Sequence, residues 1–143
     1  MSAWHGLDQD YTVKGIPHTT KIKDKPEGVG MEIKGIADGQ TGVILQIEPQ
    51  EGKEIMRTKE YSNEYNAGTA ILLRLAKPFA SSGRIVVADS AFSSVQSLKA
   101  LKVRLGLSFM GMVKTAHALY PKQFFEDEQL KIGNKLSHYI FWI

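Results

Sequence analysis

The sequence contains no cysteine, which excludes disulfide bonds and thiolate metal sites and leaves the compartment of the protein open. No apolar run approaches the roughly 20 residues that a membrane-spanning helix needs. The N-terminus also has no basic segment followed by an apolar run. These absences predict a cytosolic or nuclear protein that has no membrane partner. With 43% hydrophobic and 23% charged residues, the 143-residue chain matches one soluble globular domain, residues 1–143.

Acidic residues are missing from one long stretch of the chain, because neither Asp nor Glu occurs between Ser90 and Phe125. That stretch contains the basic residues Lys99, Lys102, Arg104, Lys114 and Lys122, with His117 among them. A region of one charge attracts polyanions, and the nucleic-acid backbone is the commonest polyanion. The alternative is a solvated helix face whose lysine stems cover apolar surface. The formal net charge of +3 does not decide between the two.

The stretch RIVVADSAFSS, residues 84–94, places Asp89 directly after an apolar β-branched run. This pattern predicts a strand that is covered on both faces and ends at the aspartate. In open α/β sheets, ligands and metals bind at the carboxyl ends of the strands, so Asp89 is the first candidate for catalysis or metal binding. The alternative is that this aspartate forms a local turn or caps the next helix.

The residues that follow predict a helix and a second strand. Ser93 or Ser94 can cap the helix, apolar residues recur at spacings of three and four, and Gly106 is typical of a helix end. The run LSFMGMVK, residues 107–114, predicts a strand. Residues 84–114 therefore predict a βαβ unit with a parallel crossover.

An antiparallel hairpin is predicted upstream of this unit. The runs within residues 30–49 flank Asp38-Gly39, a dipeptide that favours tight turns, and their alternation gives each strand one drier face. The charged residues 51–68 predict a connecting loop. Residues 69–79 predict a helix that Thr69 caps and Pro78 ends. The fold class is thus α/β, with an antiparallel hairpin followed by the βαβ unit.

Three other kinds of site are disfavoured by the pattern. A Ser-His-Asp hydrolase could use Asp89, Ser93 or Ser94, and His117, but the chain has no Gly-x-Ser-x-Gly elbow. The four histidines are scattered, which excludes the ligand spacing of common zinc sites. The glycine-rich run EGVGMEIKG lacks the Lys-Ser/Thr pair of a phosphate-binding loop.

Several blocks of the sequence resemble the transposase domain of piggyBac-type elements and their domesticated derivatives. The blocks are SAWHG, GIPHTTKIKDKPEGVGMEIKGIADGQTGVIL, GRIVVADSAFSSVQSLKAL and GLSFMGMVKTAHALYPKQF. The most specific positions are Asp89, Ser90, Phe92, Ser93, Ser94, Gly106, Gly111, Val113, Lys114 and Pro121. The resemblance covers the chain up to about Phe125 and implies a partial RNase H-like fold with a mixed sheet.

The resemblance also implies a site, a cofactor and partners. Three aspartates bind Mg²⁺ or Mn²⁺ in intact members of this family, and Asp89 matches the second, so it is the predicted catalytic and metal-binding residue. This chain, with one of the three, is expected to bind neither ion tightly. DNA is the implied partner and the nucleus the implied location, while a homodimer stays open as the assembly. The predicted contacts to the DNA backbone come from charge and not from family motifs, and they are Lys99, Lys102, Arg104 and Lys114.

Two departures from the family pattern shape the expected function. The first family aspartate would precede the segment matching Met1–Trp4, and the third would follow the tail near HYIFWI. The expectation is a fragment of a piggyBac-type DNA transposase core of the DDE/DDD class. Because only one of the three catalytic aspartates is present, this chain is expected to be inactive in cut-and-paste transfer. Two alternatives stay open. One is a domesticated, non-catalytic DNA-binding or protein-interaction module, and the other is a relic that folds poorly.

Overall fold

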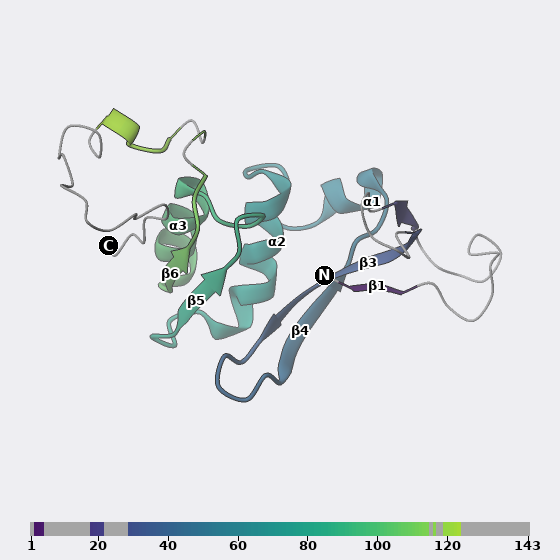
Figure 1. The fold of residues 1–143 in the computed structure, drawn as a ribbon, viewed down its shortest axis with the longest axis horizontal. Coiled ribbons are helices and arrows are strands. Elements are labelled where there is room, and N and C mark those ends of the chain that lie inside the picture. The colour runs from purple at the N-terminus through teal and green to yellow at the C-terminus, as the bar shows by residue number, and fades with distance from the viewer. Residues whose placement is uncertain (1, 5–17, 22–28, 115, 117–118, 124–143) are drawn as a thin grey trace, which may run out of the picture. The chain divides into compact units, whose positions relative to one another are not determined.

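The computed structural model of the chain describes residues 2–4, 18–21, 29–114, 116 and 119–123 (Figure 1). The chain divides into two compact units with the boundary between Tyr65 and Asn66, and each unit is treated separately below. Whether residues 1–143 act as one domain stays a prediction.

The first unit is built around an antiparallel sheet. Its strands are β1 (Ser2–Trp4), β2 (Thr20–Lys21), β3 (Val29–Ala37) and β4 (Ile44–Pro49). The long strand β3 pairs with each of the other three. The β3–β4 ladder runs from Ile33 opposite Pro49 to Ala37 opposite Ile44, with a register shift between Ile36 and Ala37. This pairing confirms the predicted hairpin.

The Asp38 side chain shapes the hairpin loop. Its carboxylate accepts hydrogen bonds from the Thr41 backbone N–H at 2.8 Å and from the Thr41 hydroxyl at 2.7 Å. The Asp38 N–H donates to the Val43 carbonyl at 2.9 Å, and Gly42 adopts a φ of 70°, which suits glycine. The loop is therefore wider than the two-residue turn that Asp38-Gly39 favours, because the aspartate binds Thr41 instead.

The hairpin leaves much of its apolar surface exposed. Val43, Ile44, Leu45 and Ile47 are between 42% and 67% exposed, whereas Glu48 is buried. The alternation predicts that Val43, Leu45 and Ile47 share the more apolar face of the second hairpin strand, and in the structure all three side chains are exposed.

A short helix that the sequence did not indicate follows this sheet. Helix α1 (Lys53–Thr58) lies where a loop was predicted, and none of its residues is buried. After it, the Lys59 ammonium lies 2.7 Å from the Glu51 carboxylate and 3.7 Å from the Glu48 carboxylate. The basic side chain nearest the helix end is thus paired with acidic groups.

The second unit contains the predicted βαβ arrangement. Its elements are helix α2 (Ala67–Ala76), the 3₁₀ turn η1 (Lys77–Phe79), strand β5 (Ile85–Ala88), helix α3 (Val95–Ala100), the π-helical turn η2 (Leu101–Leu105) and strand β6 (Ser108–Gly111). Strands β5 and β6 pair in parallel, from Ile85 opposite Ser108 to Ala88 opposite Gly111 (Figure 1). This geometry confirms the α/β class.

The helix caps in this unit agree with the prediction only in part. Ser94 caps α3 by accepting from the Ser97 N–H, and Gly106 ends η2 with a φ of 62°. Asn66 and not Thr69 caps α2, because the Asn66 side chain accepts from the Thr69 N–H at 2.9 Å. Thr69 instead lies buried in the first turn of α2.

The core of the second unit lies between its helices and one face of its strands. Leu73, Leu101 and Leu107 are almost fully buried, and Val86 and Phe109 are buried from the strand side. Residues Ile85 and Val87, on the opposite face of β5, are 47% and 71% exposed. The prediction that β5 is covered on both faces is therefore wrong for the described structure.

Among the described helices, none is long and apolar enough to cross a membrane.

Candidate functional site

Asp89 lies at the carboxyl end of the parallel strand pair, directly after β5, and its side chain is exposed. The Asp89 Oδ1 accepts a hydrogen bond from the Ala91 N–H at 2.9 Å. The Asp89 carbonyl accepts from the N–H groups of Phe92 at 3.2 Å and Ser93 at 3.0 Å. The two interpretations of this aspartate are thus compatible, since it forms a local turn and also presents a carboxylate at the sheet edge.

Ser93 and Gly111 pack closely together beside the Asp89 turn. The Ser93 hydroxyl donates to the Ala88 carbonyl at 3.0 Å, and Ala88 is the β5 partner of Gly111. A Cβ atom on Gly111 would lie 2.1 Å from Ser93 Oγ and 2.9 Å from the Ala88 carbonyl oxygen. Only glycine therefore fits at the end of β6 while Ser93 keeps this position.

The serines have structural partners, which counts against the hydrolase alternative. Ser93 and Ser94 are both 6% exposed, and each hydroxyl is hydrogen-bonded within the unit. Ser93 donates to a backbone carbonyl, and Ser94 caps α3. His117, the third residue of that alternative, lies outside the described residues.

A buried cluster of hydroxyl groups joins α2 to α3 beside the Asp89 turn. Ser97 Oγ lies 2.9 Å from Thr69 Oγ1 and 2.9 Å from Ser94 Oγ, and it donates to the Phe92 carbonyl at 2.8 Å. Thr69 and Ser97 are each 1% exposed. The sequence pattern did not indicate this cluster, because the Thr69–Ser97 contact joins residues far apart in the chain.

The four predicted DNA contacts are all exposed, and they lie on two segments of the second unit. Lys99 is on α3, Lys102 and Arg104 are on η2, and Lys114 follows β6. Their assignment as DNA contacts stays a prediction.

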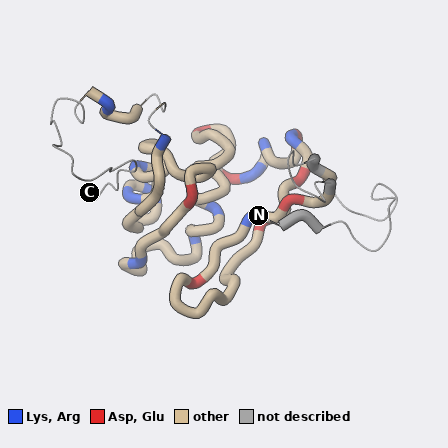
Figure 2. The backbone as a smooth tube through the Cα atoms, viewed as in Figure 1, with Lys and Arg blue, Asp and Glu red and all other residues tan. Residues whose placement is uncertain are grey.

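The charge of this part of the chain is strongly one-sided (Figure 2). Residues 66–123 carry a single acidic residue, Asp89. Their basic residues are Arg74, Lys77, Arg84, Lys99, Lys102, Arg104, Lys114 and Lys122. Asp89 is thus an isolated carboxylate in a cationic segment.

The described side chains around Asp89 do not form a complete metal centre. Across the part of the chain that the structure describes, no three His, Asp or Glu side chains gather closely enough to hold a metal ion. Two-ion phosphoryl-transfer sites need several carboxylates around ions about 3.5 to 4 Å apart. Asp89 supplies one such ligand, and the described residues beside it supply hydroxyl groups that already have partners.

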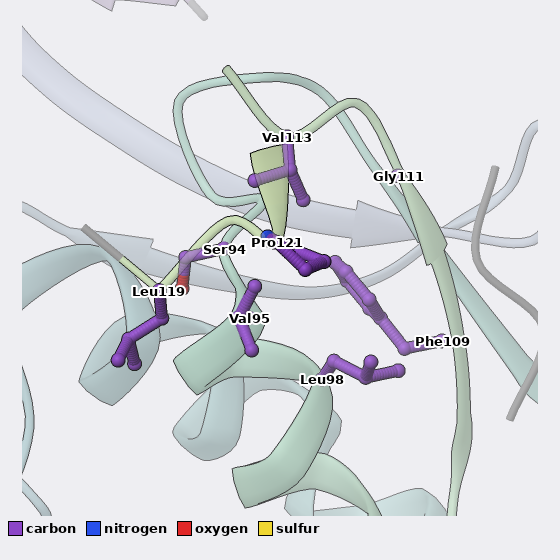
Figure 3. Close-up of a pocket in the computed structure, with 8 residues that line it drawn as sticks. All are labelled: Ser94, Val95, Leu98, Phe109, Gly111, Val113, Leu119 and Pro121. Atoms are coloured by element: carbon purple, nitrogen blue, oxygen red, sulfur yellow. The ribbon is translucent and has the colours of Figure 1, made fainter. Parts of the chain in front are cut away.

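An apolar pocket of about 140 Å³ opens between α3, β6 and the segment after β6 (Figure 3). Its lining residues are Ser94, Val95, Leu98, Phe109, Gly111, Val113, Leu119 and Pro121. The Ser94 hydroxyl that lines it is engaged with Ser97, so the wall offers few polar groups to a ligand. The helical spacing of Val95 and Leu98 indicated a buried face and not a pocket.

Comparison with known proteins identifies the family and the fold. The family model described as Transposase IS4 matches residues 7–139. A search of curated proteins found no match. The solved structure of a piggyBac transposase synaptic complex with hairpin DNA matches with a TM-score of 0.65 and 24% sequence identity. The match covers 76% of this chain and 22% of that chain, so this chain spans about a fifth of the length of that transposase. These matches confirm the resemblance to a piggyBac-type transposase domain, and the chain belongs to the IS4 transposase family.

Proposed function

We propose that this chain is the part of a DNA transposase core that carries Asp89 at its catalytic edge and contacts the DNA backbone through its second unit. The observation that carries the proposal is the position of Asp89 at the carboxyl end of a parallel strand pair, as the one carboxylate among eight basic residues in residues 66–123. Membership of a transposase family and likeness to a transposase solved with DNA support the same assignment.

The second unit is assigned to an RNase H-like core. Such a core places catalytic carboxylates at the strand ends of a mixed sheet, and Asp89 at the end of β5 has that relation to β6. In an intact transposase of this class, Asp89 is the residue of this segment that would coordinate Mg²⁺ or Mn²⁺. The described residues supply one carboxylate at this edge, so the remaining metal ligands belong to other parts of a transposase core. The chain by itself is therefore proposed to bind DNA without catalysing cut-and-paste transfer.

The DNA contacts are proposed to be Lys99, Lys102, Arg104 and Lys114, because all four are exposed and the sequence has no Asp or Glu between Ser90 and Phe125. Each lysine or arginine that neutralises a phosphate releases counterions, so affinity falls as salt rises. A nuclear location and a homodimeric assembly belong to the same proposal. Imaging of a tagged chain and light scattering of the purified protein would test them.

The experiment that tests DNA binding is a fluorescence anisotropy titration of a labelled duplex at several NaCl concentrations. Changing Lys99 and Lys102 together to Gln is expected to reduce the slope of log K against log salt by about 1.8, at about 0.9 for each lost phosphate contact. The matched control changes Lys53 and Arg57 of α1 to Gln, two exposed cations in the unit that also contains acidic groups. Equal slopes for the wild type and the Lys99/Lys102 variant would remove these contacts from the proposal.

The alternative is a non-catalytic DNA-binding or protein-interaction module whose contacts lie away from Asp89. The variant Asp89→Asn separates the two functions. If Asp89 lies at the DNA-facing edge, removing its charge lowers repulsion with phosphate and raises DNA affinity about 2-fold to 5-fold, measured in EDTA. If the chain binds DNA or a protein elsewhere, the affinity for DNA does not respond to this substitution.

A further inference from the structure

The orientation of the Asp89 carboxylate depends on the peptide groups that follow it. Its Oδ1 is bound to the Ala91 N–H at 2.9 Å, and within the described residues no hydrogen bond to its Oδ2 is seen. The direction of the carboxylate is thus set by where the Ala91 amide points. Whatever fixes the peptides of Ala91 and Phe92 also fixes Asp89.

The peptide groups of Ala91 and Phe92 contact both α2 and α3. The Phe92 carbonyl accepts from the Ser97 hydroxyl of α3 at 2.8 Å. On the α2 side, a Cβ atom on Gly68 would lie 3.1 Å from the Ala91 carbonyl oxygen, so the helix approaches the turn closely. The turn that follows Asp89 is therefore packed against α2 and hydrogen-bonded to α3.

Ser97 is the centre of this arrangement, and its hydrogen bonds can be assigned completely. A serine hydroxyl has one proton and two acceptor lone pairs. Because the proton of Ser97 goes to the Phe92 carbonyl, the neighbouring hydroxyls of Thr69 and Ser94 must both donate to Ser97 Oγ. Ser94 Oγ in turn accepts from the Ser97 N–H at 2.9 Å. Thr69 on α2 thus fixes the hydroxyl that holds the turn.

We propose that Ser97, held by the Thr69 hydroxyl, is a positioning residue for Asp89. This inference rests on the proposed role of Asp89 at the DNA-facing edge, and it adds that α2 controls the direction of the carboxylate through a chain of buried hydroxyls. Every hydroxyl in that chain is at most 6% exposed, so water does not replace a lost partner without a local rearrangement.

The test compares two substitutions at Thr69 by residue-resolved amide hydrogen exchange. Thr69→Val keeps the shape and removes the hydroxyl, whereas Thr69→Ser keeps the hydroxyl and removes a methyl group. The Val variant is expected to speed exchange at Ala91, Phe92 and Ser93 about tenfold relative to the strand amides of Val86 and Phe109, as for one lost buried hydrogen bond. The Ser variant is expected to leave that ratio within about twofold of the wild type.

Ser97→Ala provides a second measurement and should have a larger selective effect, because it removes the acceptor of two hydroxyls and the donor to Phe92. If this variant does not fold, the Thr69 pair still decides the question. Exchange that rises equally at the turn and in the strands, or equally in both Thr69 variants, would show a general packing role and overturn the proposal. Because no DNA is present in this measurement, its outcome is independent of the anisotropy test of DNA binding.

Discussion

The two units of the chain use apolar residues in opposite ways. In the second unit Leu73 and Leu101 are fully buried between the helices and strands, whereas β4 of the first unit exposes Ile44 at 67% and Ile47 at 59%. Charge differs as well, since Lys59 of the first unit has acidic partners, whereas residues 66–123 of the second unit carry a single acidic residue, Asp89. The second unit thus combines a closed core with the candidate site, and the comparison predicts different responses to substitution.

The largest contrast is expected for removal of apolar side chains. Leu101→Ala leaves a cavity in the second unit and should lower the free energy of unfolding by about 2 to 5 kcal/mol. Ile44→Ala in β4 removes a largely exposed side chain and should change it by less than about 0.5 kcal/mol. Urea unfolding followed by residue-resolved hydrogen exchange measures both, and equal losses at the two positions would contradict the contrast.

A second contrast concerns glycine positions. Gly111→Ala places a methyl group 2.1 Å from Ser93 Oγ, and overpacking of this kind costs about 1 to 3 kcal/mol. Gly39→Ala in the hairpin loop meets no atom within 4 Å and serves as the control. Thermal unfolding should show a lower midpoint for the first variant only. A Gly111 variant as stable as the wild type would mean that Ser93 moves aside without cost.

The helix starts give a smaller contrast. Asn66→Ala removes the side-chain cap of α2 and should cost about 1 kcal/mol. The N-cap of α1 is Gly52, which makes no side-chain hydrogen bond, so Gly52→Asn should add a few tenths of a kcal/mol. Both changes are measured from urea unfolding midpoints. If Asn66→Ala lowered the free energy of unfolding by less than Gly52→Asn raised it, the expected order of the two effects would be wrong.

Substitution on the exposed strand β4 is expected to have the smallest effect on stability and a clear effect on self-association. Ile47→Lys should leave the free energy of unfolding within about 0.5 kcal/mol, because the side chain is 59% exposed. It should also reduce self-association seen by light scattering, because a charged residue opposes pairing of exposed strands. The control is Gln46→Lys, which adds the same charge to β4 without removing an apolar group. If both variants reduce association equally, charge and not the apolar surface is responsible.

Local sequence signals predicted the elements that depend on neighbours in the chain. The turn residues around Asp38 indicated the hairpin, and Ser94 and Gly106 marked the two ends of the helix between the parallel strands. The position of Asp89 followed from the β-branched run before it. The cap of α2 was misassigned to Thr69, although Asn66 precedes it and asparagine is at least as good a cap.

The features that sequence reasoning missed depend on contacts between distant segments. The hydroxyl cluster needs α2 and α3 to pack together, and no local pattern at Thr69 or Ser97 encodes that. Helix α1 buries no residue, so it has no apolar stripe to reveal it. The exposure of Val87 likewise depends on what covers the sheet, which a β-branched run does not specify.

The parallel crossover between β5 and β6 also has a kinetic consequence. A hairpin such as β3–β4 closes a short loop and forms in about 1 to 10 μs. Strands β5 and β6 pair only after α3 and η2 have crossed between them, so loop-closure entropy opposes their first contacts. We expect the hairpin to form first and the turn at Asp89, which needs Gly111 and Ser93 together, to form late. A chain emerging from the ribosome would then assemble its candidate site after β6 has been made.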